Sequence, residues 1–160
     1  MLASLDSVCR LLNRWVEYLL FSLGLSMALL VAVQVFCRYI LNSSLFWSEE
    51  LARYMLVWIS FFGAVAGFYH HLHPGVDVVT SRLSPAGRFF CQVAVHGLTI
   101  LLALAMVISG SQFAWFVRLQ ISPALGLPKW LVLSVIPLSG MLFLLYAITF
   151  LLQTIRDHKP

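Results

Sequence analysis

The chain has 160 residues, of which 61% are hydrophobic and only 10% are charged. An ordinary soluble domain carries about 25% charged residues, so this composition indicates an integral membrane protein. The net charge of +4 comes from ten Lys and Arg residues scattered singly between apolar runs, without the clustered basic patch typical of nucleic-acid binding. The cysteines Cys9, Cys37 and Cys91 form no CxxC pair, so we expect neither a disulfide framework nor a zinc ribbon.

The N-terminal part of the chain predicts a surface helix followed by a first span. Residues 1–17 place apolar and polar side chains at helical spacing, a pattern typical of a short amphipathic helix at the membrane surface. The uncharged run over residues 18–37 is about as long as the roughly 20 residues of a bilayer crossing and exceeds the about 7–15 of a signal-peptide core. No small-residue cleavage site follows, so we predict that this run stays as the first span.

The second span is predicted over residues 47–69, and it starts beside the acidic pair Glu49 and Glu50. Ser48 is positioned to cap its first turn, and the helix dipole favours carboxylates at this end. Arg53 lies four residues after Glu49 and three after Glu50, which makes an intrahelical ion pair available.

Small residues share one face further along the second span, at Ser60, Gly63 and Gly67. The Gly63-x-x-x-Gly67 spacing lets another helix approach closely in a membrane. We therefore predict that this face packs on protein rather than lipid, either within this chain or against another subunit.

Two further spans follow a polar connection over residues 70–88. The third, over residues 89–117, is longer than a bilayer needs, so it either tilts or emerges around residues 109–112. The fourth runs over residues 130–155, and Pro137 should kink it. Ser134 and Ser139 are available to satisfy the backbone groups that this kink frees. We expect one all-α integral membrane domain over residues 1–160, with four transmembrane helices plus short amphipathic interfacial helices.

Lys and Arg residues outside the span interiors predict the orientation of a membrane protein. Six lie in the N-terminal segment, the middle loop and the C-terminal segment, against four on the opposite side. The four are Arg38, Arg53, Arg118 and Lys129. The six are Arg10, Arg14, Arg82, Arg88, Arg156 and Lys159. We therefore predict a multi-pass protein with both termini in the cytoplasm.

The chain shows no nucleophile and base set, Walker loop or dinucleotide fingerprint, so we do not expect an enzyme or a bound cofactor. The middle of each predicted span is free of charge, whereas alternating access usually needs ionisable groups near the midplane. Glu49 and Glu50 lie near a span end, where a structural or docking role suffices. The alternative is a transported-ion role, which needs a partner that buries them.

The histidines suggest two sites that we weigh against simpler roles. His70, His71 and His73 lie close to Asp77, but adjacent histidines rarely share one metal, so we predict no metal site. His96 lies in the third span, where a packed, hydrogen-bonded histidine is the simpler interpretation. Haem ligation, as in a redox membrane anchor, is the alternative.

The stretch over residues 38–64 combines an Arg-Tyr pair, an Asn, a Trp, paired acids, Leu-x-Arg-Tyr, a second Trp and Gly-Ala. In this chain these are Arg38, Tyr39, Asn42, Trp47, Glu49, Glu50, Leu51, Arg53, Tyr54, Trp58, Gly63 and Ala64. A second pattern, His-x-x-Val-Asp, follows the second span as His73, Val76 and Asp77. Together they resemble the small membrane subunit (DctQ-like, small permease) of tripartite ATP-independent periplasmic (TRAP) transporters.

This resemblance implies a bacterial inner-membrane scaffold subunit that pairs with a large multi-span permease and, through the complex, with a periplasmic substrate-binding protein. It implies sodium-symport uptake of an organic acid, such as a dicarboxylate, a sugar acid or a sialic acid, with the substrate and sodium sites in the large subunit. The motif residues are then expected to fix the bend between the first two spans and to contact the binding protein. Two alternatives are a haem-binding redox anchor subunit and a small homo-oligomeric exporter.

Overall fold

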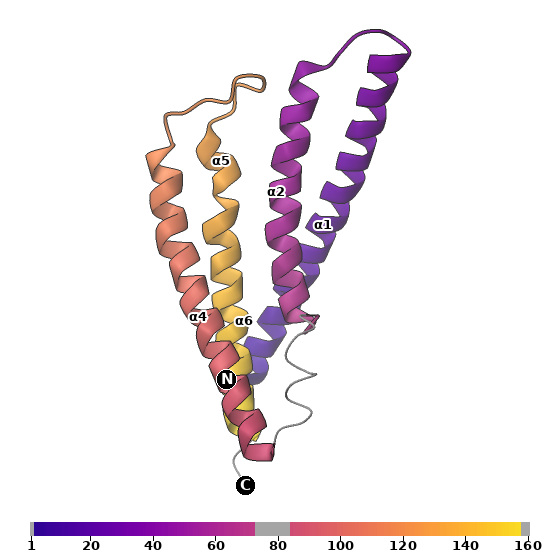
Figure 1. Ribbon diagram of the computed structural model, residues 1–160. Coiled ribbons are helices and arrows are strands. Elements are labelled where there is room, and N and C mark those ends of the chain that lie inside the picture. The colour runs from indigo at the N-terminus through magenta and orange to yellow at the C-terminus, as the bar shows by residue number, and fades with distance from the viewer. Residues whose placement is uncertain (1, 73–83, 158–160) are drawn as a thin grey trace.

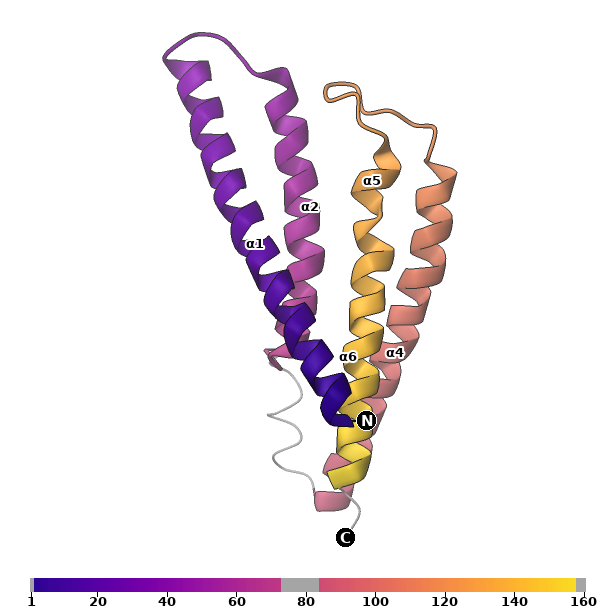
Figure 2. The ribbon, with the colours of Figure 1, turned by 180° about the vertical axis from the view of Figure 1, so that it is seen from behind.

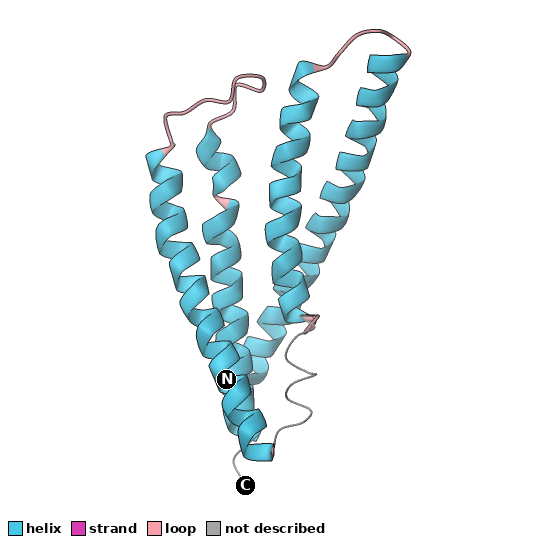
Figure 3. Ribbon diagram, in the orientation of Figure 1, coloured by secondary structure: helices cyan, strands magenta, loops and turns pink. Residues whose placement is uncertain are grey.

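The computed structural model describes residues 2–72 and 84–157, and every regular element within them is a helix (Figures 1 and 3). The helices are α1 (Leu2–Tyr39), α2 (Phe46–Tyr69), α4 (Pro85–Phe116), α5 (Lys129–Leu133) and α6 (Val135–Asp157). Four helical segments are long and apolar enough to cross a membrane, with α5 and α6 together forming the last. The prediction of an all-α membrane protein with four spans is therefore confirmed.

The helices form two antiparallel hairpins, α1 with α2 and α4 with α5 and α6 (Figure 1). Both termini lie at one end of the molecule, which we call the termini end, and the connections over residues 40–45 and 117–128 lie at the other, which we call the loop end (Figures 1 and 2). The hairpins converge at the termini end and spread toward the loop end. The most extensive helix contact is between α4 and α6, and both α1 and α2 also touch α6.

Apolar side chains from three helices form the core between the hairpins. One cluster consists of Cys9, Val65, Phe68, Tyr146, Ala147 and Phe150. The second, nearer the middle of the bundle, consists of Val16, Phe62, Ala66 and Val135. Because these residues belong to α1, α2 and α6, the core joins the first hairpin to the last helix.

Helix α1 differs from expectation because it continues without a break through residue 17, where a surface helix was expected to give way to the first span. No proline occurs in this stretch and Gly24 is its only glycine, so the backbone has no residue that breaks a helix. The buried positions of the first segment are Cys9, Asn13 and Val16. They lie on one face of α1, which packs against protein.

Helix α4 begins four residues before the predicted start, because Ser84 caps it. The hydroxyl of Ser84 accepts a hydrogen bond from the backbone N–H of Gly87 at 3.3 Å, and Pro85 occupies the first turn, where its missing N–H costs nothing. The helix continues without interruption through residues 109–112 to Phe116. Gly110 within that segment is buried against α6.

The fourth span is interrupted as predicted, but the break lies at Ser134, three residues before Pro137 (Figure 3). Proline frees the carbonyl one turn before it, so a break on its N-terminal side is the expected consequence. The hydroxyls of Ser134 and Ser139 donate to the carbonyl oxygens of Leu131 at 2.7 Å and Ile136 at 3.0 Å. Pro137 frees the carbonyl of Leu133, four residues before it. Neither serine bonds that carbonyl, so the prediction that they satisfy the freed group is wrong.

Candidate functional site

The turn between α1 and α2 places the first motif residues at the loop end. Arg38 lies in the last turn of α1, which ends at Tyr39. Asn42 has a φ of 49°, a left-handed conformation that asparagine adopts more readily than most residues. The N–H of Ser43 then donates to the carbonyl oxygen of Cys37 at 3.0 Å. This conformation gives a physical reason for asparagine at position 42.

Glu50 is the central residue of this end. Its side chain is buried, and its carboxylate accepts three hydrogen bonds. The hydroxyl of Tyr54 donates to Oε1 at 2.5 Å, while the backbone N–H groups of Ala124 and Leu125 donate to Oε2 at 2.9 and 3.2 Å. We call Glu50, Tyr54 and these two amides the carboxylate anchor. Because Tyr54 belongs to α2 and the amides belong to the loop after α4, the anchor ties the two hairpins together.

The loop that supplies these amides is itself folded. The N–H of Ser122 donates to the carbonyl oxygen of Leu127 at 2.9 Å, and the N–H of Gly126 donates to that of Ser122 at 3.1 Å. Gly126 has a φ of +66°, which glycine adopts without steric strain. The buried hydroxyl of Ser122 accepts from the N–H of Leu125 at 3.2 Å. The turn thus presents successive N–H groups to one point, an arrangement that favours an anionic partner, and Glu50 is that partner.

Glu49 differs from Glu50 in its surroundings, although the two are adjacent. Glu49 is exposed in the first turn of α2, and the Nε of Arg53 donates to the backbone oxygen of Glu49 at 3.4 Å. Neither of the two ion pairs within residues 2–72 and 84–157 involves Arg53. The expected intrahelical ion pair is therefore corrected to a contact with the backbone, and the charges of Glu49 and Arg53 face outward.

The start of α2 also differs from expectation, because Ser48 is not its cap. The helix begins at Phe46 after Leu45, which makes no side-chain cap bond. Ser48 is fully buried, and its hydroxyl donates backward to the carbonyl oxygen of Leu45 at 2.7 Å. A serine inside the first turn can satisfy its hydroxyl locally in this way. Trp47, beside it, is 42% exposed at the loop end.

Trp58 connects α2 to the broken fourth span. Its indole N–H donates to the carbonyl oxygen of Val132 in α5 at 3.1 Å. In a regular helix the carbonyl of Val132 would accept a hydrogen bond from the backbone N–H four residues later. The break at Ser134 lies between these two groups. Trp58 therefore supplies a donor where the helix is interrupted, which sequence reasoning did not foresee.

The small-residue face of α2 is open. A Cβ atom added at Gly63 or Gly67 would meet nothing within 4 Å, and Ser60 on the same face is exposed, with its hydroxyl bonded to its own helix. Close packing within the chain occurs instead between α4 and α6. A Cβ at Gly110 would lie 2.8 Å from Ile136, and one at Gly140 would lie 3.0 Å from Met106. Within the described residues no helix packs closely on the Gly63 face, and packing against another subunit stays a prediction.

A polar cluster at the termini end was missed by sequence reasoning. Glu17 on α1 lies 2.6 Å from the Nε2 of His70, which follows α2. The side-chain amide of Asn13 donates to Glu17 at 2.6 Å, and Asn13 is buried. Asn13 and Glu17 are four residues apart on one helix face, which was the signal in the sequence. The cluster joins the C-terminal end of α2 to the first half of α1.

The other described histidines, His71 and His96, lie beside an aromatic ring. His71 and His96 both pack against the ring of Phe150, with centroid distances of 4.7 and 6.1 Å. Within the described residues no three His, Cys, Asp or Glu side chains gather as a metal ion requires. The second motif, His73, Val76 and Asp77, lies outside the described residues.

Sequence analysis named Tyr54 only as a motif residue, and it did not name Ala124 or Leu125, the two other donors to Glu50. Tyr54 lies four residues after Glu50, which places both side chains on one helix face. The Ser122-Pro-x-x-Gly126 sequence indicates a tight turn. A turn whose N–H groups converge needs an acceptor, but nothing in the sequence shows that this turn reaches α2.

Comparisons with known proteins point to one family. Residues 27–157 match the family described as tripartite ATP-independent periplasmic transporters, DctQ component. A protein of Haemophilus influenzae, named as a candidate TRAP transporter small permease, is 31% identical over 150 residues, which cover 93% of this chain and 92% of that protein. The C4-dicarboxylate TRAP transporter small permease DctQ of Rhodobacter capsulatus is 34% identical over 62% of this chain and 44% of its own length.

A third relative is the ectoine TRAP transporter small permease TeaB of Halomonas elongata, 26% identical over 88% of this chain and 73% of its own length. The family match covers most of the chain, including α2 with the carboxylate anchor and the whole second hairpin. With four apolar helices long enough to span a membrane, the chain belongs to the DctQ family and is a small permease subunit of a TRAP transporter.

Proposed function

We propose that this subunit is the fixed scaffold of a TRAP uptake system in a bacterial inner membrane, where it holds a large multi-span permease. The observation that carries this proposal is the use of Glu50. Its carboxylate accepts hydrogen bonds from Tyr54 in α2 and from Ala124 and Leu125 in the second hairpin. This use of both carboxylate oxygens supports a bracing role within the subunit over the binding of a transported ion. A carboxylate held by backbone amides and a tyrosine is costly to release, because its donors would be left unpaired.

The open face of α2 is our candidate for the contact with the large permease. Gly63 and Gly67 have free space above them, and Ser60 extends the same face. Without side chains in the way, a helix of another subunit can approach the backbone of α2 closely, which is the main source of helix association in a membrane.

Leucine substitutions test this contact. Gly63→Leu and Gly67→Leu should each abolish co-purification with a co-expressed large permease in mild detergent, since the added side chain fills the space that the partner helix needs. Gly97→Leu in α4 is the matched control, because it is also a helical glycine with nothing within 4 Å of an added Cβ. Equal permease recovery with all three variants would refute this docking face.

We further propose that both termini lie in the cytoplasm, so that the loop end faces the periplasm. The excess of Lys and Arg in the N-terminal, middle-loop and C-terminal segments of the sequence, six against four, supports this orientation. A membrane-impermeant thiol reagent should then label a cysteine introduced at Leu119 in the loop, which is 83% exposed, but not one introduced at Ser4. Cys9, Cys37 and Cys91 are replaced beforehand. Labelling at Ser4 alone would reverse the orientation.

The exposed groups at the loop end are our candidates for contact with the periplasmic binding protein. Glu49 and Arg53 are exposed there, and Trp47 is partly exposed. Such rim charges act mainly on the rate of encounter. Glu49→Lys should therefore change the concentration of binding protein that gives half-maximal uptake in proteoliposomes, while the maximal rate stays unchanged. An unchanged half-maximal concentration would argue against this contact.

We propose that the complete system takes up an organic acid together with sodium. Relatives named for C4-dicarboxylates and for ectoine support a small, charged organic solute. Uptake by the reconstituted system should stop when sodium is replaced by potassium. Exchanging this subunit for a relative should leave substrate preference unchanged, and a change in preference would assign this chain a direct role in selection.

A further inference from the structure

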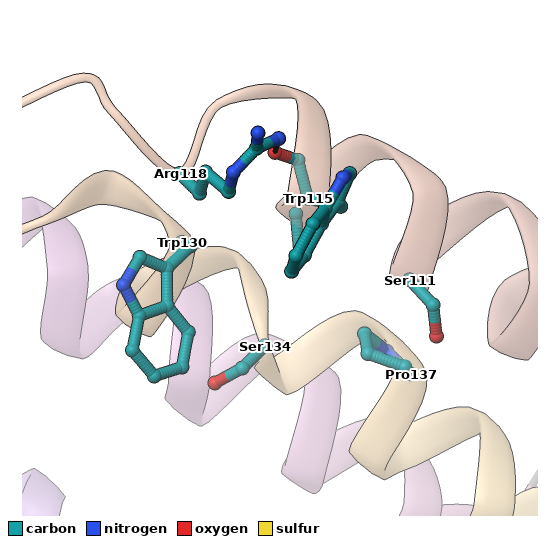
Figure 4. A pocket seen from close by; sticks show the side chains of 7 residues that line it. Ser111, Trp115, Arg118, Trp130, Ser134 and Pro137 are labelled. Carbon is teal, nitrogen blue, oxygen red and sulfur yellow. Dashed lines mark hydrogen bonds between the residues drawn. The ribbon is translucent and has the colours of Figure 1, made fainter.

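A groove between α4 and the broken fourth span opens at the loop end. It has a volume of about 420 Å³. Trp115 and Arg118 line it from the α4 side, and Trp130, Ser134 and Pro137 line it from α5 and α6 (Figure 4).

The groove exists because the two helices separate above a tight contact. At Gly110 an added Cβ would lie 2.8 Å from Ile136 and 3.1 Å from Pro137, so the backbones are close there. One turn further along α4, Ala114 already lines the groove. The interruption of the fourth span at Ser134 lies at the same level, and Ser134 itself lines the groove. In a membrane such an apolar space is filled by lipid or by protein, since water is excluded from the hydrocarbon region.

A cation stands at the rim of this groove. The guanidinium carbon of Arg118 lies 4.1 Å from the ring centroid of Trp115, and Nη1 donates to the carbonyl oxygen of Trp115 at 3.0 Å. This leaves other guanidinium N–H groups for an anion, and neither ion pair among the described residues involves Arg118. Trp115 and Trp130 lie near the ends of their spans, where tryptophan marks the level of the lipid headgroups.

The walls below Arg118 offer little to a soluble polar ligand. The hydroxyls of Ser111 and Ser134 donate to the carbonyl oxygens of Val107 at 2.6 Å and Leu131 at 2.7 Å within their own helices. The other lining groups are an alanine, a proline and two tryptophans. A ligand that fits therefore has an anionic end at the rim and an apolar tail.

We propose that this groove binds one anionic phospholipid, with its phosphate on Arg118 and an acyl chain between α4 and α6 beside Ala114 and Pro137. A guanidinium recognises phosphate through several N–H groups at once. Trp115 holds that guanidinium in place from below. This inference does not depend on the scaffold role proposed above.

Native mass spectrometry of the full-length protein, alone and with the co-expressed permease, tests the site with phosphatidylglycerol as the probe. Arg118→Gln removes the charge at the rim, and Ala114→Phe fills the groove while keeping the charge. Each should weaken retention of one phosphatidylglycerol by about tenfold, the effect expected when a charge-assisted hydrogen bond or a buried chain is lost. The control, Arg156→Gln, removes an exposed cation at the termini end and should leave retention unchanged. Unchanged permease recovery shows that the variants fold.

Three results would overturn the proposal. Equal retention of phosphatidylglycerol by wild type and Arg118→Gln would remove the role of the cation. Displacement of the lipid by millimolar inorganic phosphate would make the site one for a soluble anion. Retention by the isolated chain that disappears when the permease is present would show that a permease helix occupies the groove instead.

Discussion

Gly140 is the position where one methyl group tests the packing of α4 on α6 most directly. In Gly140→Ala the new Cβ would lie 3.0 Å from the Cβ of Met106, 3.1 Å from the backbone oxygen of Ala103 and 3.1 Å from Val107. The Cβ of Met106 and the backbone oxygen of Ala103 cannot rotate away, because both are bonded directly to the backbone. The two helices must therefore move apart to accept the methyl group.

Two opposing terms set the size of this effect. Alanine stabilises a helix over glycine by about 0.5–1 kcal/mol, whereas overpacking destabilises by about 1–3 kcal/mol. The net expectation is a loss of about 1–2 kcal/mol. Since about 1 kcal/mol shifts the Tm of a chain of this size by about 2–4 °C, the Tm should fall by about 2–8 °C.

Thermal unfolding of the purified protein in mild detergent, followed by circular dichroism, measures this shift. Gly97→Ala is the matched control, because an added Cβ there meets nothing within 4 Å. Gly97→Ala should gain the higher helix propensity of alanine without any steric overlap, so the Tm should rise by about 1–4 °C. A Gly140→Ala protein at least as stable as wild type would refute the close packing of the two helices.

Three further substitutions test contacts between the elements. Glu50→Gln removes the charge from the anchor and should speed hydrogen exchange at the N–H groups of Ala124 and Leu125. The control Glu49→Gln should leave their exchange unchanged. Equal exchange rates in the two variants would contradict the role of Glu50 in the anchor. Trp58→Phe loses one hydrogen bond between helices, worth about 1 kcal/mol. The Tm should therefore fall by about 2–4 °C. An unchanged Tm would show that this bond does not stabilise the fold. Glu17→Gln weakens a half-exposed contact with His70 and should lower stability by at most about 1 kcal/mol; a larger loss would mean that the pair is shielded from solvent.

The number and approximate bounds of the spans follow from the sequence, because length and hydropathy decide which segments can cross a bilayer. Which face of each helix meets protein does not follow, since lipid-facing and protein-facing residues are equally apolar. The two glycine patterns show this limit. Gly63 and Gly67 form the recognisable motif but face open space, while Gly110 and Gly140, on different helices, make the close contacts.

The anchor was predictable only in part. The position of Glu50 beside a helix start and its spacing to Tyr54 are visible in the sequence, but its partners Ala124 and Leu125 lie 74 and 75 residues away. Backbone N–H groups occur in nearly every residue, so no side-chain pattern marks those that will meet a carboxylate. The resemblance to the small permease family identified the motif, and the structure supplies a physical role for its second acid.

Because the two hairpins spread apart, the two ends of the subunit should differ in rigidity. From the termini end to the middle of the bundle, two buried apolar clusters join the hairpins. Such packing resists displacement, because each ångström of separation loses many contacts at once. At the loop end the carboxylate anchor and the Trp58 bond join them, and a few hydrogen bonds can exchange with water one at a time. Helix α2, with 24 residues, is a lever arm of about 36 Å between these ends. We therefore expect the loop end to deform more easily than the termini end when another protein binds there. The carboxylate anchor should limit how far the two hairpins separate.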